Sequence, residues 1–306
     1  MRVLIIGLGS IAQKHIKALK SVDEKVELFA LRSSSSEREY SYPEITSIYN
    51  IDELSVVPDF IIITNPTFLH RQTIEDCLLL KSPIIIEKPV LGNPDEGNEL
   101  SKKIEEAGVI TYVACNMRFH PALQFVKQNL KPNVHKIQEV NIYCGSYLPD
   151  WRPNRNFREV YSAKKEMGGG VHLDLIHEID YCVWLFGRPT KYSSIKSSKS
   201  HLKISAIDYV HYNFEYQNFN ADITLNYYRR KPKRTLEILF EYETWLVDLL
   251  ESTIINDNGE ILFKSDFNIM DTYLDQAKYF CRHIKLNKTM MNDFNEALQI
   301  LEIATR

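Results

Sequence analysis

The chain of 306 residues is long enough for two domains, and its 44% apolar and 25% charged residues are typical of a globular protein. Its formal net charge of -3 provides no overall positive field, so neither nucleic acid nor an anionic membrane is an expected partner. No apolar run approaches the roughly 20 residues that span a bilayer, and the apolar stretch at the N-terminus is too short for a signal peptide. We therefore expect a cytoplasmic protein.

Short aliphatic runs alternate with helical patterns from the N-terminus to residue 119. The runs predict strands that are apolar on both sides, at 2–7, 26–32, 59–64, 82–88 and 109–115. Such strands imply a parallel sheet that is covered by helices on both faces. Asn93 is a good N-cap and Pro94 suits a first helical turn, so a helix is predicted that ends near Gly108. Residues 1–119 are therefore predicted to form an α/β domain.

Longer strands of alternating character follow residue 136, for example "KIQEVNIYCG" and "AIDYVHYNFEY". They predict an antiparallel or mixed sheet with one buried face. The pair Asn258-Gly259 signals a hairpin, and helices are expected at 270–286 and from Asp293 onward. Residues 120–306 are therefore predicted to form an α+β domain with a large sheet.

Neither the cysteines nor the serine-rich stretches indicate a special site. The five cysteines form no CxxC pair, which favours reduced thiols in packing roles over disulfides or a zinc site. The serine-rich stretches 33–36 and 193–200 are expected to be loops. No metal is expected.

The stretch "GLGSIA" follows the first predicted strand and opens a helix with the spacing G-x-G-x-x-A. This context is the fingerprint of a dinucleotide-binding Rossmann turn. Gly7 would make the tight turn, and Gly9 would let the backbone approach a pyrophosphate. The helix start at Ser10 and Ile11 would offer N–H groups and a positive dipole end to the phosphates. We therefore predict that residues 1–119 are a Rossmann dinucleotide-binding domain.

The end of the second strand bears on the choice of dinucleotide. NAD enzymes usually place an acidic residue there for the ribose hydroxyls, whereas "ALRSSSS" provides Arg32 and Ser33. An arginine and hydroxyl groups suit a 2′-phosphate, so NADP is favoured over NAD. The alternative is that Arg32 is a solvated loop charge.

Two further strand ends contribute candidate residues. "ITNPTFLH" (63–70) and "IIIEKP" (84–89) each finish a predicted parallel strand. The carboxyl ends of such strands border the crevice in which open α/β sheets bind ligands. Cofactor contacts are expected from Thr64, Asn65, Pro66, His70, Glu87 and Lys88. For His70, a structural role is the alternative.

With "NMRFHP" (116–121) and "EMGGGVHLDLIHEID" (166–180), these motifs resemble those of the Gfo/Idh/MocA family of sugar and polyol oxidoreductases, over essentially the whole chain. The resemblance implies that Lys88 lies beside the nicotinamide and binds the reacting hydroxyl. It also implies that Asp174 and His177 bind the reacting region of the sugar, with the imidazole commonly accepting the proton. The usual family spacing between these two residues is four, whereas here it is three, which leaves the proton acceptor open.

A helix over this stretch would place Asp174 and His177 on one face, because residues three apart are neighbours on a helix. The three glycines before it would bring backbone close to the nicotinamide and the substrate. An ordinary imidazole has a pKa of about 6.5 and can accept and return a proton. The Lys88 cation would favour alkoxide character on the reacting hydroxyl. His172 falls on a different face and is expected to be structural.

Arginines and aromatic residues are interleaved in "SYLPDWRPNRNFREVYSAKKE" (146–166). Arginine binds carboxylates and phosphates through two hydrogen bonds, and aromatic rings pack on sugar faces. An acidic or nucleotide-linked sugar is therefore an attractive substrate. The alternative is a solvated loop, because the stretch also contains acidic residues. Substrate contacts are expected from Arg118, Trp151, Arg152 and Arg158.

The leading prediction is an NAD(P)-dependent oxidoreductase that acts on a secondary hydroxyl or ketone of a sugar derivative. One alternative is an epimerase or lyase that recycles a tightly bound cofactor, and another is a non-catalytic dinucleotide sensor on the same fold. Family members commonly associate through the outer face of the second sheet, so a homodimer or homotetramer is expected. Tyr209, Tyr212 and Phe214 would lie either in such an interface or in the interior of the chain.

Overall fold

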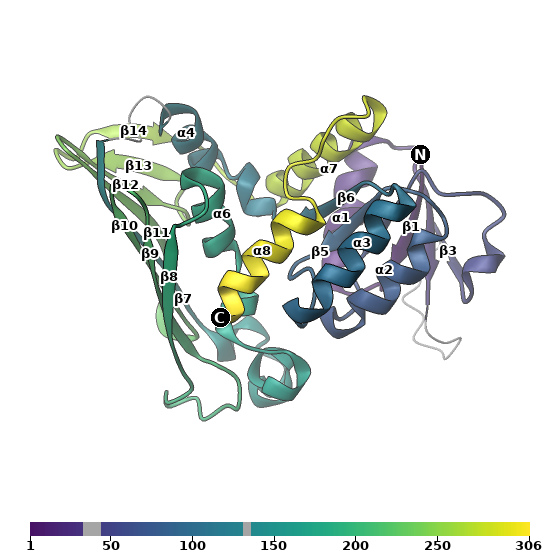
Figure 1. Cartoon of the computed structure of the whole chain (residues 1–306), viewed down its shortest axis with the longest axis horizontal. Coiled ribbons are helices and arrows are strands. Elements are labelled where there is room, and N and C mark those ends of the chain that lie inside the picture. Colours follow the sequence, from purple (N-terminus) through teal and green to yellow (C-terminus); the bar gives the residue numbers. More distant parts are fainter. Residues whose placement is uncertain (33–43, 131–135) are drawn as a thin grey trace. The chain divides into compact units, whose positions relative to one another are not determined.

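In a computed structural model, the protein folds into two compact units (Figure 1). The described residues are 1–32, 44–130 and 136–306. The first unit consists of residues 1–116 and 270–299, and the second of residues 117–269 and 300–306. The serine-rich stretch 33–36 lies outside the described residues.

Six parallel strands form the sheet of the first unit, in the order β3-β2-β1-β4-β5-β6. Their bounds are β1 (Arg2–Ile6), β2 (Glu27–Leu31), β3 (Ile45–Ile48), β4 (Phe60–Ile63), β5 (Ile84–Glu87) and β6 (Thr111–Ala114). The central strands are buried along their whole length, as expected for a parallel sheet covered on both faces. This sheet confirms the predicted Rossmann-type fold. The edge strand β3 was not predicted, because "ITSI" is short and only half apolar.

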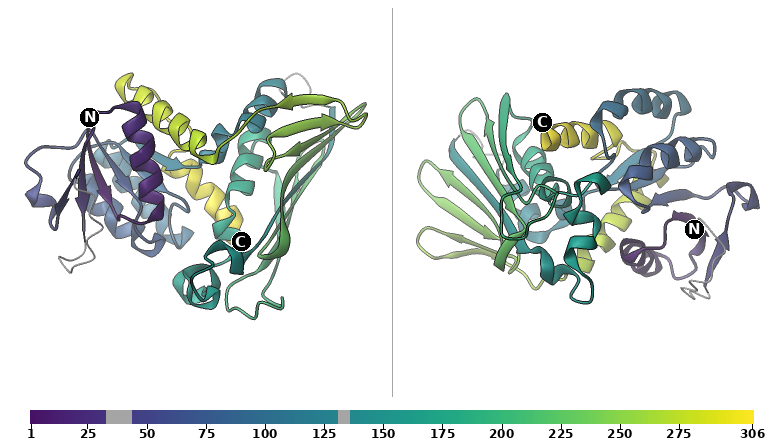
Figure 2. Two further views of the ribbon diagram at one scale, coloured as in Figure 1. Left: turned by 180° about the vertical axis from the view of Figure 1, so that it is seen from behind. Right: turned by 90° about the horizontal axis from the view of Figure 1, so that it is seen from below.

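Helices cover both faces of this sheet. Their bounds are α1 (Ser10–Val22), α2 (His70–Leu78), α3 (Gly97–Ala107), α7 (Ile269–Lys285) and α8 (Phe294–Thr305). Figure 1 shows α2 and α3 side by side on one face, where Arg71 pairs with Glu99. Figure 2 shows α1 and α7 on the other face, where Phe280 of α7 meets Phe60 of β4 edge-on.

Residues 270–299 pack against the first sheet, although the sequence-based division assigns everything after residue 119 to the second domain. Tyr112 of β6 contacts the rings of Tyr279 and Phe280, which lie on α7. Helix α7 and the first half of α8 are therefore part of the cover of the N-terminal sheet. This return of the chain joins residues that are far apart in sequence, so local patterns do not reveal it.

The helix ends carry the predicted caps. The side chain of Asn93 accepts a hydrogen bond from the N–H of Asp95, and α3 ends at Gly108 in the left-handed conformation, with φ at 64°. At the start of α8, Asp293 accepts a hydrogen bond from the N–H of Glu296 at 2.8 Å. The helices predicted from these caps are confirmed, and α7 confirms the one predicted at 270–286.

Eight strands form the sheet of the second unit, in the order β14-β13-β12-β11-β7-β10-β9-β8. Their bounds are β7 (Ile137–Tyr147), β8 (Lys191–Ser197), β9 (Tyr209–Glu215), β10 (Asn220–Asn226), β11 (Tyr228–Phe240), β12 (Thr244–Asp248), β13 (Thr253–Asn256) and β14 (Ile261–Lys264). β7 and β10 pair in parallel, and the other described pairs are antiparallel, which confirms the predicted mixed sheet. The predicted Asn258-Gly259 hairpin joins β13 to β14, with φ of Gly259 at 79°.

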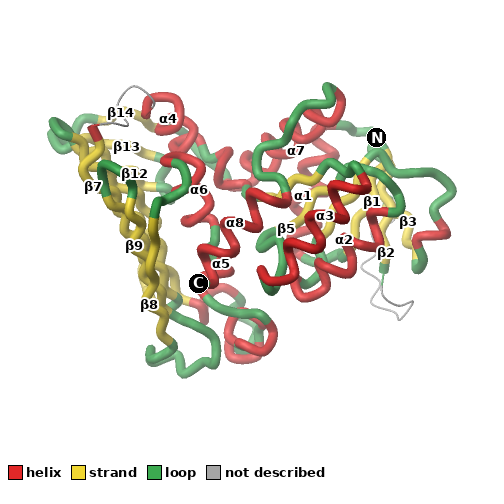
Figure 3. Tube along the Cα trace, in the orientation of Figure 1, coloured by secondary structure: helices red, strands yellow, loops and turns green. Residues whose placement is uncertain are grey.

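Helices cover one face of this second sheet (Figure 3). They are α4 (Pro121–Leu130), α5 (Val171–Asp174) and α6 (His177–Phe186). Val140, Ile142 and Cys144 of β7 are buried, while Asn141 and Tyr143 alternate with them and are half-buried. Because successive side chains of a strand point to opposite faces, the strand has one core face and one more polar face.

The structure corrects the prediction for residues 193–200 and places Tyr212 and Phe214. The prediction of a loop at 193–200 is wrong for most of that stretch, because β8 pairs with β9 as the edge strand of the sheet. Tyr212 and Phe214 are fully buried, and the Tyr212 hydroxyl donates to the carbonyl of Ala304 at 2.7 Å. These two residues therefore belong to the interior of the chain.

The structure also bears on the role of the cysteines and on whether any helix could span a membrane. All five cysteines are buried, which agrees with packing roles. Among the described residues, we find no helix with the length and apolar character needed to cross a bilayer.

Candidate active site

The turn between β1 and α1 is tightly packed at Gly7 and has open space at Gly9. Gly7 has φ at 91°, and a Cβ there would lie 2.9 Å from the backbone of Asn65, so this position requires glycine. Gly9, by contrast, has an ordinary backbone conformation, and a Cβ there would have no atom of the described residues within 4 Å. No side chain caps the start of α1 at Ser10. The helix start at Ser10 and Ile11 therefore fits an anionic group such as a phosphate.

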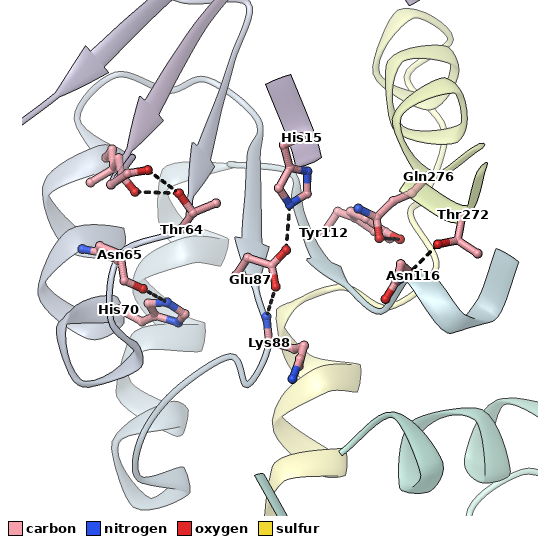
Figure 4. Close-up of polar contacts among 12 residues, drawn as sticks. His15, Thr64, Asn65, His70, Glu87, Lys88, Tyr112, Asn116, Thr272 and Gln276 are labelled. Atoms are coloured by element: carbon pink, nitrogen blue, oxygen red, sulfur yellow. Dashed lines mark hydrogen bonds and ion pairs between the residues drawn. The ribbon is translucent and has the colours of Figure 1, made fainter. Parts of the chain in front are cut away.

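The end of β4 supports this turn. The hydroxyl of Thr64 donates to the carbonyl of Gly7 at 2.6 Å (Figure 4), which fixes the neighbouring turn. The amide of Asn65 donates to Thr73 at 2.7 Å, and its buried Oδ1 finds no partner among the described residues. Pro66 follows and is exposed. This strand end thus offers a hydrogen-bond acceptor and an exposed ring beside the glycine turn.

The imidazole of His70 lies buried between two loops (Figure 4). Its Nε2 is 3.1 Å from the carbonyl oxygen of Asn65, and its Nδ1 is 3.1 Å from that of Val90. Burial lowers the pKa of His70. The side chain thus links the loop after β4 to the loop after β5, which agrees with the alternative of a structural role for His70. Direct contact of His70 with a cofactor stays a prediction.

Glu87 and Lys88 follow β5 at the carboxyl edge of the sheet. One oxygen of the buried Glu87 carboxylate is 2.7 Å from Nε2 of His15, which comes from α1. The other oxygen accepts a hydrogen bond from the backbone N–H of Lys88 at 3.2 Å (Figure 4). Glu87 is thus held inside the first unit, and Lys88 is half-buried. Sequence patterns gave no signal for His15 beyond its place on a buried helix face.

Arg32 lies just after β2, where its backbone N–H donates to the carbonyl of Ile48 at 3.0 Å. The side chain is half-buried. Ser33 lies outside the described residues. The prediction of a 2′-phosphate site at this strand end therefore stays a prediction.

In the second unit, both oxygens of the Asp174 carboxylate accept hydrogen bonds from tyrosines. Tyr161 donates to Oδ1 at 2.8 Å, and Tyr227 donates to Oδ2 at 2.5 Å. Burial, together with the negative charge of Asp174, raises the pKa of both tyrosines. Both phenols therefore keep their protons and remain donors to the carboxylate. This arrangement fixes the orientation of Asp174 from two sides.

The glycines before Asp174 make this arrangement possible. A Cβ at Gly169 would lie 2.0 Å from the carbonyl oxygen of Tyr161, and Gly170 has φ at 146°. The segment that carries Tyr161 can therefore fold closely against the start of α5. The proposed approach of these glycines to a nicotinamide stays a prediction.

Asp174 and His177 do not share one continuous helix, which corrects the sequence-based expectation. Asp174 ends α5 and His177 begins α6, with Leu175 at φ -101° and ψ 34° outside the helical range. Because their positions differ by only three, their Cα atoms lie within about 11 Å of each other. His177 is half-buried. His172 is buried, as expected for a structural histidine, and burial lowers its pKa to about 4.

The predicted substrate residues divide into two groups. The ring of Trp151 meets Tyr227 edge-on at 5.4 Å, and the guanidinium of Arg152 lies over the ring of Tyr161 at 5.7 Å. Trp151 and Arg152 thus border the same cluster as Asp174. Arg158 lies instead over the ring of its neighbour Phe157 and is exposed.

Arg118 was predicted to contact substrate, and its position argues for a correction. The side chain is fully buried, and its Nε and Nη2 donate to the two oxygens of Asp180 at 3.0 and 2.7 Å. A two-bond ion pair of this kind satisfies a buried charge inside the unit. We therefore assign Arg118 to the interior that supports α6.

Tyr227 is the site residue that the sequence did not indicate at all. It lies between β10 and β11 and is followed by a second tyrosine, Tyr228, and tyrosines are common in and beside the strands of any sheet. Tyr161 lies in the stretch 146–166, where its aromatic character alone assigns it no particular role. The missing information was the fold itself, which brings Tyr161 and Tyr227 to the same carboxylate.

Two family models match the chain. Residues 1–115 match one described as "Oxidoreductase family, NAD-binding Rossmann fold", and residues 136–244 match one described as "GFO/IDH/MocA C-terminal domain". The two matches occur in the order of the two structural units. The residues that they span include the glycine turn, Lys88, Asp174 and His177.

Several known proteins with sequence similarity are dehydrogenases by name, and one is named as a hydratase. The chain is 25% identical over 228 residues to scyllo-inositol 2-dehydrogenase (NADP(+)) IolW of Bacillus subtilis (strain 168). The match covers 72% of this chain and 61% of that protein, so the chain spans less than two thirds of the relative's length.

Solved structures share the fold over nearly the full chain. A levoglucosan dehydrogenase in complex with NADH and levoglucosan superposes with a TM-score of 0.84, at 16% identity, covering 99% of this chain and 95% of that one. UDP-N-acetylglucosamine 3-dehydrogenase GnnA from Acidithiobacillus ferrooxidans gives 0.80 at 17% identity, with the same coverage of 99% and 95%. At these identities the likeness shows the fold alone.

Proposed function

Because the chain belongs to the Gfo/Idh/MocA family of oxidoreductases, we propose that it is an NAD(P)-dependent dehydrogenase acting on a secondary hydroxyl group of a sugar or polyol. One observation carries the proposal most directly. The uncapped start of α1 at Gly9 and the lysine after β5 belong to the same carboxyl edge of one parallel sheet. That edge is where open α/β sheets bind dinucleotides.

The residues of this edge fit the cofactor. The N–H groups of Ser10 and Ile11 would hold the phosphates, and the space beside Gly9 would admit them. A bound nicotinamide supplies the hydride chemistry, which no protein side chain provides. Arg32 supports NADP over NAD, as does the name of the Bacillus relative.

Three side chains would then bind and orient the substrate and accept its proton. The ammonium group of Lys88 would bind the reacting hydroxyl and stabilise the negative charge that develops on its oxygen. The imidazole of His177 would accept the hydroxyl proton. Asp174, held by two tyrosine hydroxyls, would orient the sugar through fixed acceptor positions. Each group then acts without a large reorganisation during the reaction.

The cluster around Asp174 also bears on the kind of sugar. Trp151 and Tyr161 provide aromatic faces of the sort that pack on sugar rings. Arg152 lies beside them and would pair with a carboxylate or phosphate. An acidic or nucleotide-linked sugar is therefore our finer proposal. Arg152→Ala should raise the KM of such a substrate, whereas Arg158→Ala should change it little.

The proposal is tested with the purified protein, NADP+ or NAD+, and a panel of polyols and sugars. The panel takes its members from the names of similar proteins: scyllo-inositol, myo-inositol, glucose 6-phosphate, levoglucosan and UDP-N-acetylglucosamine. We expect reduction of the dinucleotide with at least one of them, and its loss in Lys88→Met. Lys102→Met, an exposed change on α3, is the control and should retain activity.

Other outcomes would favour the alternatives. Dinucleotide that co-purifies with the protein, seen by native mass spectrometry, would favour an epimerase or lyase that recycles its cofactor. Tight dinucleotide binding without turnover of any panel member would favour a sensor. Failure to bind NADPH or NADH, measured by fluorescence, would remove the basis of the proposal. Loss of an NADPH preference in Arg32→Ala would support the 2′-phosphate site.

We also propose a homodimer or homotetramer. Helices α4–α6 cover one face of the second sheet, and the opposite face carries half-buried residues such as Asn141, Tyr143 and Tyr209. Such a face can pair with its copy around a twofold axis. A monomeric mass by light scattering at micromolar concentration would contradict this proposal.

A further inference from the structure

The carboxylate of Glu87 lies in a closed environment beneath the carboxyl edge of the first sheet. Its side chain is 10% exposed, and the His15 side chain that it faces is 3% exposed. The ring of Tyr273, from α7, meets the His15 imidazole edge-on at 5.6 Å. His15 and Glu87 are therefore enclosed by α1, α7 and β5, and a solvent molecule has little access to replace either partner.

The two oxygens of Glu87 have different partners (Figure 4). Oε1 is 2.7 Å from Nε2 of His15, and Oε2 accepts the backbone N–H of Lys88 at 3.2 Å. Figure 4 shows that the side chain of Lys88 extends away from this carboxylate. The contact therefore fixes the main chain at the base of the lysine and leaves the ammonium group to point elsewhere.

We propose that His15 is a positioning residue, whose imidazole holds the Glu87 carboxylate so that Glu87 fixes the backbone from which Lys88 reaches the substrate. This inference rests on the proposed function, because the role of Lys88 belongs to it. In this proposal, His15 affects Lys88 through its contact with Glu87. The link runs from α1, whose start is the proposed phosphate site, to the loop that carries the lysine.

The physical reason for the link is the cost of an unsatisfied buried carboxylate. If the hydrogen of Nε2 is lost, Glu87 keeps its burial but loses its shortest hydrogen bond. A buried carboxylate without a partner either takes up a proton or moves toward solvent. Both changes weaken or break the bond to the Lys88 N–H, and the loop gains freedom at the base of the lysine.

The opposing interpretation is that His15 only fills the core beside Tyr273. In that case, a side chain of similar volume would preserve the position of Lys88. The pair His15→Leu and His15→Gln separates the two interpretations. Leucine fills the space without a donor, whereas the amide of glutamine can donate to Glu87.

The first readout is hydrogen exchange at the backbone N–H of Lys88 in the full chain. We expect about tenfold faster exchange in His15→Leu, the effect of losing one hydrogen bond, and near wild-type exchange in His15→Gln. Ser82→Ala is the control, because it removes a buried hydrogen bond to Pro58 at the opposite end of β5. Its Lys88 amide should exchange as in the wild type.

The second readout is the kinetic effect with the panel member that the wild-type chain oxidises. We expect kcat to fall by about tenfold or more in His15→Leu, with little change in KM or in the Kd of NADPH, because a misplaced catalytic group affects the transition state most. His15→Gln should restore most of kcat. In a Glu87→Gln background, His15→Leu should add little, because its effect passes through the carboxylate.

Unchanged exchange at Lys88 in His15→Leu would overturn the inference, and so would a rise in KM with kcat unchanged. If His15→Leu does not fold, His15→Gln and Glu87→Gln still report on the same link. If the wild type oxidises no panel member, the proposed function fails separately. Faster exchange at Lys88 in His15→Leu would then establish the link from His15 to the Lys88 backbone, while the proposed effect of this link on catalysis would be overturned.

Discussion

Tyr227 and Asp174 lie 53 positions apart in the sequence and meet through a hydrogen bond of 2.5 Å inside the second unit. Tyr161 donates to the other oxygen of the same carboxylate. A carboxylate with both oxygens engaged by phenols cannot rotate freely. This geometry supports the proposed role of Asp174 in orienting a sugar, with His177 as the proposed proton acceptor.

Tyr227→Phe tests the importance of this orientation. The variant leaves Oδ2 of Asp174 without its phenol donor, so we expect the free energy of unfolding to fall by about 1–2 kcal/mol and turnover of the panel substrate to fall with it. Urea unfolding and steady-state kinetics measure the two effects. Tyr212→Phe is the control, since it removes a buried phenol that donates to Ala304. It should cost similar stability and leave turnover unchanged, and equal loss of turnover in both variants would contradict the orienting role.

The sequence was sufficient for the parts of the fold that depend on local pattern. The isoleucine-rich strands β4 and β5 are buried on both faces, and such runs indicate a parallel sheet without tertiary information. The caps at Asn93 and Asp293 follow from the side-chain chemistry of helix ends. The break between α5 and α6 has no local signal, because no glycine or proline stands between Val171 and Phe186.

The candidate site was predictable only where motifs are contiguous. The glycine turn and Lys88 stand in short motifs, and so does Asp174. His15 and Glu87 are 72 positions apart, and no local periodicity pairs them. Arg118 shows the opposite error, because an arginine in a motif near the site turned out to satisfy Asp180 in the interior. Buried polar partners depend on tertiary packing, which a single sequence does not contain.

His120 should make the protein less stable in acid. Its Nδ1 accepts a hydrogen bond from the N–H of Ala122, and its Nε2 is 3.1 Å from the carbonyl oxygen of Leu249, which requires the neutral ring. Burial, and then the charge of Arg234, lower the pKa of His120 from 6.5 to about 4. Between these values the unfolded chain binds more protons than the folded one. The free energy of unfolding should therefore fall as pH decreases through this window, by up to about 3 kcal/mol.

The measurement for His120 is urea unfolding at a series of pH values. His120→Gln removes the titrating ring, so stability should depend less steeply on pH between 6.5 and about 4, with a remaining slope from His172. His201→Gln changes an exposed imidazole and should keep the wild-type slope. An unaltered slope in His120→Gln would show that another group controls the acid sensitivity.

His70→Leu tests the link between the loops after β4 and β5. The variant removes both ring contacts, to the carbonyls of Asn65 and Val90. We expect a lower midpoint of thermal unfolding and about tenfold weaker binding of NADPH, because the loops that border the proposed cofactor site lose their common support. His172→Leu, which changes a buried imidazole of the second unit, should lower stability and leave the Kd of NADPH unchanged. If His70→Leu and the wild type bind NADPH with the same Kd, His70 has a role in packing and none in supporting the cofactor site.

Gly9→Val and Gly7→Val should have opposite consequences, which gives the sharpest test of the dinucleotide site. A Cβ at Gly9 meets nothing within 4 Å among the described residues, and its backbone conformation suits any residue, so Gly9→Val should cost less than about 1 kcal/mol of stability. Its branched side chain would occupy the space proposed for the pyrophosphate, and binding of NADPH should be lost. Gly7→Val places a side chain against the backbone of Asn65 at a φ of 91°, so this variant should be strongly destabilised.

Urea unfolding and fluorescence titration with NADPH separate the two effects in these variants. A stable Gly9→Val protein that no longer binds NADPH would establish that the space beside Gly9 serves a ligand, because the fold itself has no use for it. A stable Gly9→Val protein that binds NADPH like the wild type would locate the cofactor elsewhere. In that case, the roles proposed for Lys88 and for the helix start at Ser10 would both lose their common basis, since both depend on a dinucleotide at this edge of the sheet.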